Sequence, residues 1–140
     1  MTEKNLTHIG INLLVSLPEE SVSGVEAKID TGADSSAIWA SSIHEKDGEL
    51  SFTLFDEDSP HYTGKVIKTE DFKITNVKNS FGDSERRYKV KLKVVIAGRK
   101  INSSFTLANR GKNSYSILIG KRTLHGKFLV DVSHKHIEAV

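Results

Sequence analysis

The feature that most constrains the fold is a two-residue alternation in segment 86–98, RRYKVKLKVVIAG. Cations occupy positions 87, 89, 91 and 93, and apolar residues occupy positions 88, 90, 92 and 94. Successive side chains of a strand point to opposite faces of a sheet, whereas a helix would scatter these residues around its surface. The pattern therefore predicts a strand with one basic face and one apolar face.

Most of the remaining chain shows similar strand signals, namely β-branched runs, alternation and turn residues between the runs. We expect strands at 8–17, 24–30, 49–56, 65–78, 101–109, 115–120 and 128–132, the fourth of them long or broken. The segment 79–85 ahead of the basic strand has Gly82-Asp83 at its middle, which predicts a hairpin.

Helical signals are few. Segment 35–45 is compatible with one or two helical turns, and segment 121–126 favours a short helix that ends at Gly126. A length of 140 residues fits one domain of ordinary size. The sequence predicts a single all-β domain over residues 1–140, a closed barrel or folded-over sheet with one short helix near the C-terminus.

Several classes of functional site are not supported by the sequence. The chain has no Cys, so disulfides and Cys-built metal sites are excluded. His44-Glu45 begins like a zinc-protease motif, but Gly48 stands where the second His is required. There is no Gly-x-Ser-x-Gly nucleophile motif and no phosphate-binding loop. We expect neither a metal nor another cofactor.

The early apolar run IGINLLVSL is interrupted by Asn12 and lacks a basic region before it, so it favours a strand over a signal peptide. No run approaches the ~18 apolar residues of a membrane span. We therefore expect a cytoplasmic protein with no membrane partner.

The net charge of +2 hides a strong asymmetry along the chain. Residues 1–60 carry three Lys and twelve Asp and Glu, whereas residues 61–140 carry seventeen Lys and Arg and six Asp and Glu. Either one surface of the protein faces anions, or the two halves complement each other within or between subunits. A nucleic-acid partner is disfavoured, because the cations are not interleaved with exposed aromatic residues and the total charge is near zero.

The segment KIDTGADSSAIWA, residues 28–40, sets Asp30 between an apolar residue and a Thr-Gly pair. Asp-x-Gly is ordinary turn chemistry. Here, however, Asp30 ends an apolar strand, and much later a second apolar run, ILIG, ends in Gly120 and is followed at once by KRTL. Asp30 is thus either a turn residue or half of a catalytic pair.

These motifs resemble those of the retropepsin-like aspartic proteases, and more closely those of a bacterial branch labelled ATP-dependent zinc proteases. That branch has Asp-Thr-Gly-Ala-x-x-Ser-Ala, a middle hairpin, Asn-Ser-x-Gly-x-x-x-Arg, and a late Leu-x-Gly-Arg-x-x-Leu-x-Gly-x-Phe-x-Val-Asp. The corresponding segments here are DTGADSSAIWA, VKNSFGDSERRYKV and LIGKRTLHGKFLVD, and the resemblance runs from about Ile9 to Val132.

Two residues depart from the pattern. Trp39 stands where we would expect a His in that branch, and Lys121 stands where both groups usually have Arg. The sequence also contains no zinc ligand set and no nucleotide-binding motif to match the label of the branch.

The resemblance implies a retropepsin-like fold with one lobe per chain and a homodimer that supplies two catalytic aspartates. Asp30 would be the catalytic group, and Thr31 would tie the two active-site loops together across the two-fold axis. Gly32 would let backbone approach the carboxylates, and Ala33 would complete the loop.

The resemblance also implies a substrate-binding set of Asp34, Ser80, Gly82 and Arg87. Asp34 and Lys121 occupy the places of an acid–arginine pair beside the active site, and Lys lacks the planar fork of Arg. The hairpin from Asn79 to Arg87, with Gly82 at its tip, would be the flap that closes over substrate.

By resemblance the activity is aspartic endopeptidase cleavage of a peptide or protein. The branch is often associated with ligases that add glutamate tails, and the basic face of the strand leads away from the flap and could draw an acidic peptide toward the cleft, so an acidic or glutamate-tailed peptide is the expected substrate class. A solvated strand face is the competing explanation of the same basic stripe. Two alternatives stay open: a catalytically silent, dimeric peptide-binding module on the same fold, and an unrelated β-barrel interaction domain.

Overall fold

The computed structural model describes residues 5–78 and 81–134. The strands among them are β1 (Thr7–Ile9), β2 (Asn12–Leu17), β3 (Val22–Ile29), β4 (Ser36–Lys46), β5 (Glu49–Leu54), β6 (Val66–Thr69), β7 (Phe72–Lys78), β8 (Ser84–Ile96), β9 (Arg99–Ala108), β10 (Ile117–Ile119) and β11 (Phe128–Val130). A 3-10 turn, η1 (Pro18–Glu20), follows β2, and helix α1 (Lys121–Leu124) follows β10. The expected all-β architecture with one short helix near the C-terminus is confirmed.

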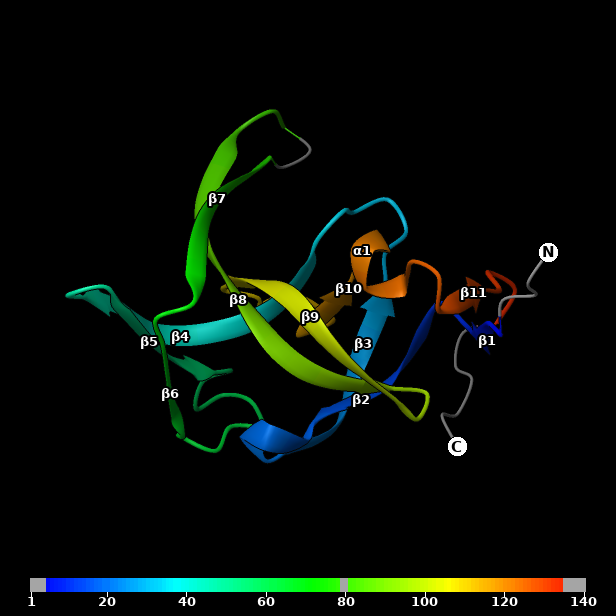
Figure 1. Ribbon diagram of the computed structural model, residues 1–140, viewed down its shortest axis with the longest axis horizontal. Coiled ribbons are helices and arrows are strands. Elements are labelled where there is room, and N and C mark those ends of the chain that lie inside the picture. The colour runs from blue at the N-terminus through cyan, green and yellow to red at the C-terminus, as the bar shows by residue number, and fades with distance from the viewer. Residues whose placement is uncertain (1–4, 79–80, 135–140) are drawn as a thin grey trace.

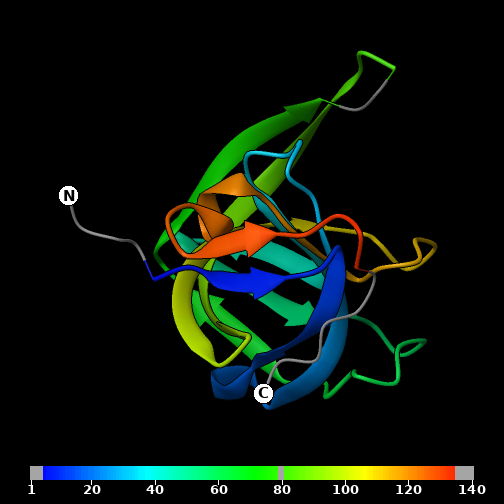
Figure 2. The same cartoon turned by 90° about the vertical axis from the view of Figure 1, so that its right-hand side faces the viewer.

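Six of the strands form a closed ring. They pair in the order β10-β3-β2-β8-β9-β4, and β4 pairs back with β10. Strands β5 and β6 continue the sheet beyond β4, β7 pairs with β8 outside the ring, and β1 and β11 form a parallel pair at one end of the molecule (Figures 1 and 2). The expected closed barrel is confirmed.

The alternation that predicted a two-faced strand is realised in β8. Val90, Leu92 and Val94 are buried in the barrel, and Lys91 and Lys93 between them are exposed. Burial of an aliphatic side chain of this size contributes about 1.5–3 kcal/mol. The apolar parity of one strand thus fixes which of its faces lines the core.

The interpretation of segment 35–45 as helical is wrong, because these residues form β4. Its first half pairs with β9 on one side and with β10 on the other, and its second half pairs with β5. The residues from Ser36 to Ala40 are all buried, so no alternation marks them as a strand. Segment 35–45 is a strand because it pairs with strands that are far away in the sequence.

Two expected strands are interrupted. Segment 8–17 is divided at Gly10, where an added Cβ would lie 2.7 Å from the carbonyl oxygen of His134. The C-terminal segment therefore packs directly onto this break. Segment 65–78 is the broken alternative that we expected, and Glu70 and Asp71 separate β6 from β7.

The predicted hairpin is confirmed, with longer arms than expected. Residues 72–78 of β7 pair with residues 84–90 of β8, and the turn between them contains Gly82 at φ +86°. This β7–β8 arm extends from the barrel on the same side as the loop that follows β3 (Figures 1 and 2). Asn79 and Ser80, including one expected substrate contact, lie outside the described residues.

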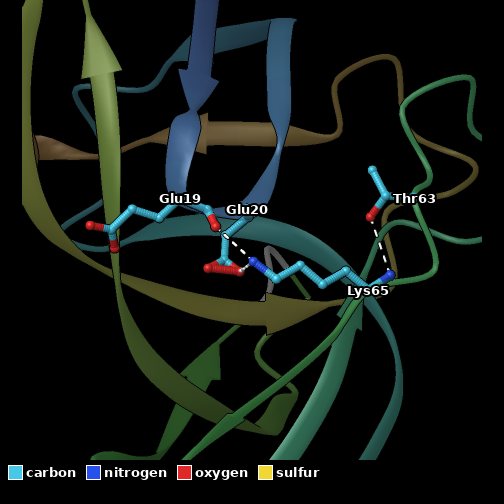
Figure 3. Close-up of polar contacts among 4 residues, drawn as sticks. All are labelled: Glu19, Glu20, Thr63 and Lys65. Carbon is cyan, nitrogen blue, oxygen red and sulfur yellow. Dashed lines mark hydrogen bonds and ion pairs between the residues drawn. The ribbon is translucent and has the colours of Figure 1, made fainter.

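Part of the charge asymmetry is neutralised within the chain. The ammonium group of Lys65 donates to the carbonyl oxygen of Glu19 at 2.7 Å and lies 3.5 Å from the carboxylate of Glu20 (Figure 3). Lys93 of β8 lies 3.2 Å from the Glu19 carboxylate. These contacts fasten the acidic turn η1 to two basic segments of the second half, so intramolecular complementarity accounts for part of the pattern.

Strand β10 is inserted between β3 and β4, parallel to β3 and antiparallel to β4. The chain leaves β10 at Gly120, directly against the loop between β3 and β4. A Cβ on Gly120 would lie 2.6 Å from the carbonyl oxygen of Ser35 and 2.9 Å from that of Ala33. Only glycine allows this approach, because both obstacles are backbone atoms.

We expect Gly120→Ala to lower the free energy of unfolding by about 3 kcal/mol, because the barrel must shift to admit the methyl group. Urea unfolding followed by tryptophan fluorescence measures the effect. Gly48→Ala is the control, because Gly48 has φ +80° and nothing within 4 Å of an added Cβ. Its cost should be about 1 kcal/mol of backbone strain, and equal losses in the two variants would contradict the steric argument.

Candidate functional site

Asp30 begins the loop that joins β3 to β4. Its backbone N–H donates to the carbonyl oxygen of Ile119 at 2.8 Å, which fixes the start of the loop to β10. Its carboxylate Oδ1 accepts a hydrogen bond from the Gly32 N–H at 3.1 Å, and its carbonyl oxygen accepts from the Ala33 N–H at 3.2 Å. Asp30 therefore makes the turn that its sequence context predicted, and its side chain stays half-exposed.

The far end of the loop is bonded to the start of α1. The backbone N–H of Lys121 donates to the carbonyl oxygen of Ala33 at 2.7 Å, and that of Arg122 donates to Asp34 at 3.1 Å. Backbone bonds from β10 and α1 thus hold both ends of the segment 30–34, which limits how far the Asp30 carboxylate can move.

A buried hydroxyl cluster supports the same junction. Thr123 Oγ1 lies 2.6 Å from Ser36 Oγ and 2.6 Å from Ser103 Oγ, and the Gly120 N–H donates to Ser36 Oγ at 3.0 Å. The three side chains are buried. The cluster links the start of β4 to α1 and β9. The end of the loop that leads into β4 is thus fixed by buried hydroxyl groups that have hydrogen-bond partners.

Asp34 and Lys121 form an ion pair at 3.2 Å with side chains 70% and 57% exposed. An exposed pair of this kind contributes at most about 1 kcal/mol. The substitution of Lys for Arg at position 121 therefore leaves a single-point contact at the surface of the loop.

The loop faces a cleft that is walled by the β7–β8 arm and by the segment after β9. Four of the expected loop residues line the cleft: Asp30, Gly32, Ala33 and Asp34. Of the other expected residues, Arg87 also lines it, Thr31 lies on the exposed part of the loop, and Gly82 lies in the turn of the arm.

The cleft is strongly cationic. Five basic residues line it, against the two carboxylates of Asp30 and Asp34: Lys78, Arg87, Lys89, Arg110 and Arg122. The sequence identified only one of these five as a site residue. The other four come from four parts of the chain: Lys78 from β7, Lys89 from β8, Arg110 from the segment between β9 and β10, and Arg122 from α1.

The basic face of β8 divides between different environments. Arg87 and Lys89 line the cleft, Lys91 is exposed outside it, and Lys93 pairs with Glu19. The pKa of Arg110 is lowered by burial and by the positive charge of Arg87, while the charge of Asp30 acts to raise it. Arg110 thus lies in a partly desolvated environment.

Within residues 5–78 and 81–134, no three His, Asp or Glu side chains gather as metal ligands would. These residues do not provide a site for the zinc named in the label of the related branch. Over the same part of the chain, no helix combines the length and the apolarity that crossing a membrane requires.

The fold agrees with a solved structure. The crystal structure of protein Lpg0085 from Legionella pneumophila, of unknown function, superposes with a TM-score of 0.73 at 23% identity, covering 94% of this chain and 97% of that one. Residues 8–139 match the RimB-like family, described as retropepsin-like aspartic endopeptidase RimB. The chain belongs to this family. An unrelated β-barrel domain is thereby ruled out.

Curated relatives of this RimB-like chain are longer proteins. Two of them, from Shewanella pealeana and Shewanella halifaxensis, are 31% and 30% identical and are named probable alpha-L-glutamate ligase. Each match covers 89% of this chain and 28% of the relative. The RimB-like chain thus spans about a quarter of the length of these proteins.

Trp39, at the position where a His was expected, lies in the core. It is buried, its ring centroid lies 6.2 Å from that of Phe55, and a Cβ on Gly111 would lie 2.8 Å from its ring. In this RimB-like chain, position 39 therefore serves packing beneath the segment that carries Arg110.

We expect Thr123→Val to lower the free energy of unfolding by about 1–3 kcal/mol, because the Ser36 and Ser103 hydroxyls lose a buried partner while the shape of the side chain is kept. Thermal and urea unfolding measure the loss. Thr63→Val is the control, because Thr63 is exposed and its hydroxyl accepts a hydrogen bond from the Lys65 N–H but from no other group of the described residues. A loss at position 123 no larger than at position 63 would contradict a structural role for the cluster.

Proposed function

We propose that the protein is an aspartic endopeptidase whose active site combines Asp30 from two copies of the chain. The observation that carries the proposal is the setting of Asp30. Its carboxylate lines a cleft, on a loop that is bonded at both ends to β10 and α1. Membership of the RimB-like family supports the same activity.

The second carboxylate is expected from a second chain, because the sequence contains one Asp-Thr-Gly segment. Asp34, the other carboxylate of the cleft, is engaged with Lys121. Thr31 and Gly32 are exposed in the single chain, so a two-fold axis can bring two such loops together. In that homodimer, the Thr31 hydroxyls would link the loops and Gly32 would allow close approach of the backbone.

Two carboxylates about 3 Å apart share one proton, because both cannot ionise. The ionised Asp30 takes a proton from a bound water as the water oxygen attacks the scissile carbonyl carbon. The protonated Asp30 of the other chain gives its proton to the carbonyl oxygen. The first Asp30 then gives its proton to the amide nitrogen as the C–N bond breaks, while the second Asp30 takes a proton from a hydroxyl of the tetrahedral intermediate. The products are a carboxylic acid and an amine, and the pair again holds one proton.

The proposed substrate is an acidic peptide, such as a glutamate tail. The cationic lining of the cleft supports this class, since opposite charge concentrates a ligand and speeds its association. The names of the glutamate ligases that contain a matching segment support it independently. The β7–β8 arm, which walls the cleft, would close over the bound peptide as a flap.

We expect Asp30→Asn to abolish cleavage of oligoglutamate-tailed peptides while the fold and peptide binding persist, because the amide cannot serve as the base. Cleavage is followed by mass spectrometry from acidic to neutral pH with a chelator present throughout. Asp71→Asn is the control, because Asp71 lies between β6 and β7 and does not line the cleft.

Sedimentation of the wild type tests the homodimer. Cleavage retained by the Asp30 variant, or by a strictly monomeric wild type, would reject the proposed mechanism. Binding without cleavage by the wild-type dimer would favour a catalytically silent peptide-binding module.

A second expectation concerns ionic strength. Raising salt from about 0.05 M to 0.5 M should lower kcat/KM for a glutamate-rich peptide severalfold, because the charges of an open cleft are screened. A peptide with Gln in place of Glu is the control and should change little. Equal responses of the two peptides would contradict electrostatic recruitment.

A further inference from the structure

Two arginines of the cleft, Arg87 and Arg110, combine partial burial with a planar guanidinium group, whereas Lys89, which is also half-buried, has only an ammonium group. Arg87 comes from β8, where the strand leaves the barrel to form the arm, and its side chain is 19% exposed. Arg110 comes from the segment between β9 and β10 and is half-buried. Both line the cleft that contains Asp30.

Arg110 is held by its own loop. Its Nε donates to the carbonyl oxygen of Tyr115 at 2.9 Å, and its carbonyl oxygen accepts from the Asn113 N–H at 2.9 Å. Among the described residues, no protein group accepts a hydrogen bond from its terminal nitrogens. The guanidinium is thus anchored at one edge, with donors left for another acceptor.

Arg87 also has unused hydrogen-bonding capacity. Its Nη2 lies 3.1 Å from the carboxylate of Glu85, which is 62% exposed, whereas its Nε is buried with no hydrogen-bond partner in the described part of the chain. An unsatisfied buried donor costs about 1–3 kcal/mol. An acceptor supplied from the cleft would remove that cost.

The electrostatics of the pair favour an added anion. Burial lowers the pKa of Arg110, and the positive charge of Arg87 lowers it further. Asp30 offsets this in part, but it forms no ion pair within 4 Å with either arginine among the described residues. Two guanidinium groups in this setting match the two oxygens of a carboxylate.

Resting on the proposed function, we propose that Arg110 and Arg87 form a subsite that binds the side-chain carboxylate of a substrate residue adjoining the scissile bond. The pair is a specificity determinant: it selects Glu or Asp over Gln or Asn at that position. A site built to bond a carboxylate rejects the neutral isostere, because its own donors are then left unpaired.

The test measures binding rather than turnover, so it does not depend on catalysis. In an Asp30→Asn background, fluorescence anisotropy gives Kd for a labelled oligoglutamate peptide and for the matching oligoglutamine peptide. We expect a preference for Glu of tenfold or more, reduced at least fivefold by Arg110→Gln and by Arg87→Gln. Lys91→Gln is the matched control, because Lys91 shares the basic parity of β8 but lies outside the cleft.

Arg110→Lys keeps the charge but loses the fork, and it should retain only part of the preference. A Glu preference unchanged within twofold in both Gln variants, or reduced equally by Lys91→Gln, would overturn the subsite. The Arg110 variant loses the hydrogen bond to Tyr115 and could fail to fold for that reason. In that case the binding measurements on Arg87→Gln decide the outcome.

The proposed function is judged separately by wild-type cleavage. An inactive wild type whose Glu preference depends on Arg110 would reject the peptidase and retain the subsite. An active wild type whose Glu preference does not depend on Arg110 would retain the peptidase and reject the subsite.

Discussion

The structure depends on the insertion of β10 between β3 and β4. This one strand closes the ring, supplies the carbonyl oxygen that fixes Asp30, and ends at Gly120 against the backbone of the loop. The loop carrying Asp30 therefore cannot move without disturbing the barrel. A cleft residue on such a junction has a fixed position, which is what acid–base chemistry requires of a catalytic group.

The basic residues of the second half of the chain have two roles: some form ion pairs with the acidic first half, and others line the cleft. Lys65, Lys93 and Lys121 each pair with a carboxylate of the acidic half, which fastens η1 and the Asp30 loop. The cations that line the cleft are a different set, and they outnumber the carboxylates that line it by five to two. Internal complementarity and a cationic cleft are thus both present, and different lysines and arginines supply each.

Local patterns predicted those elements whose exposure alternates or whose turns have specific chemistry. The basic strand, the hairpin at Gly82, the helix after Gly120 and the turn at Asp30 all follow from neighbouring residues. The segment 35–45 misled because β4 is buried on both faces over its first half and has no period to detect. Arg110 was missed because its segment reads as an ordinary turn, and only the tertiary structure brings it to the cleft that Asp30 lines.

The sequence alone determined the class of fold, the order of its motifs and the residue that begins the loop of the candidate site. Alternation, turn residues and the Asp-Thr-Gly and Ile-Gly segments are local or ordered signals, so they can be recognised without the structure. Only the tertiary structure decided what surrounds Asp30. Burial of Arg87 and Arg110, the hydroxyl cluster at Thr123 and the distribution of the β8 cations arise where β4, β8, β9 and β10 meet. Strand β4 is far from the other three in the sequence, and its contacts with them are set by pairing and burial rather than by neighbouring residues.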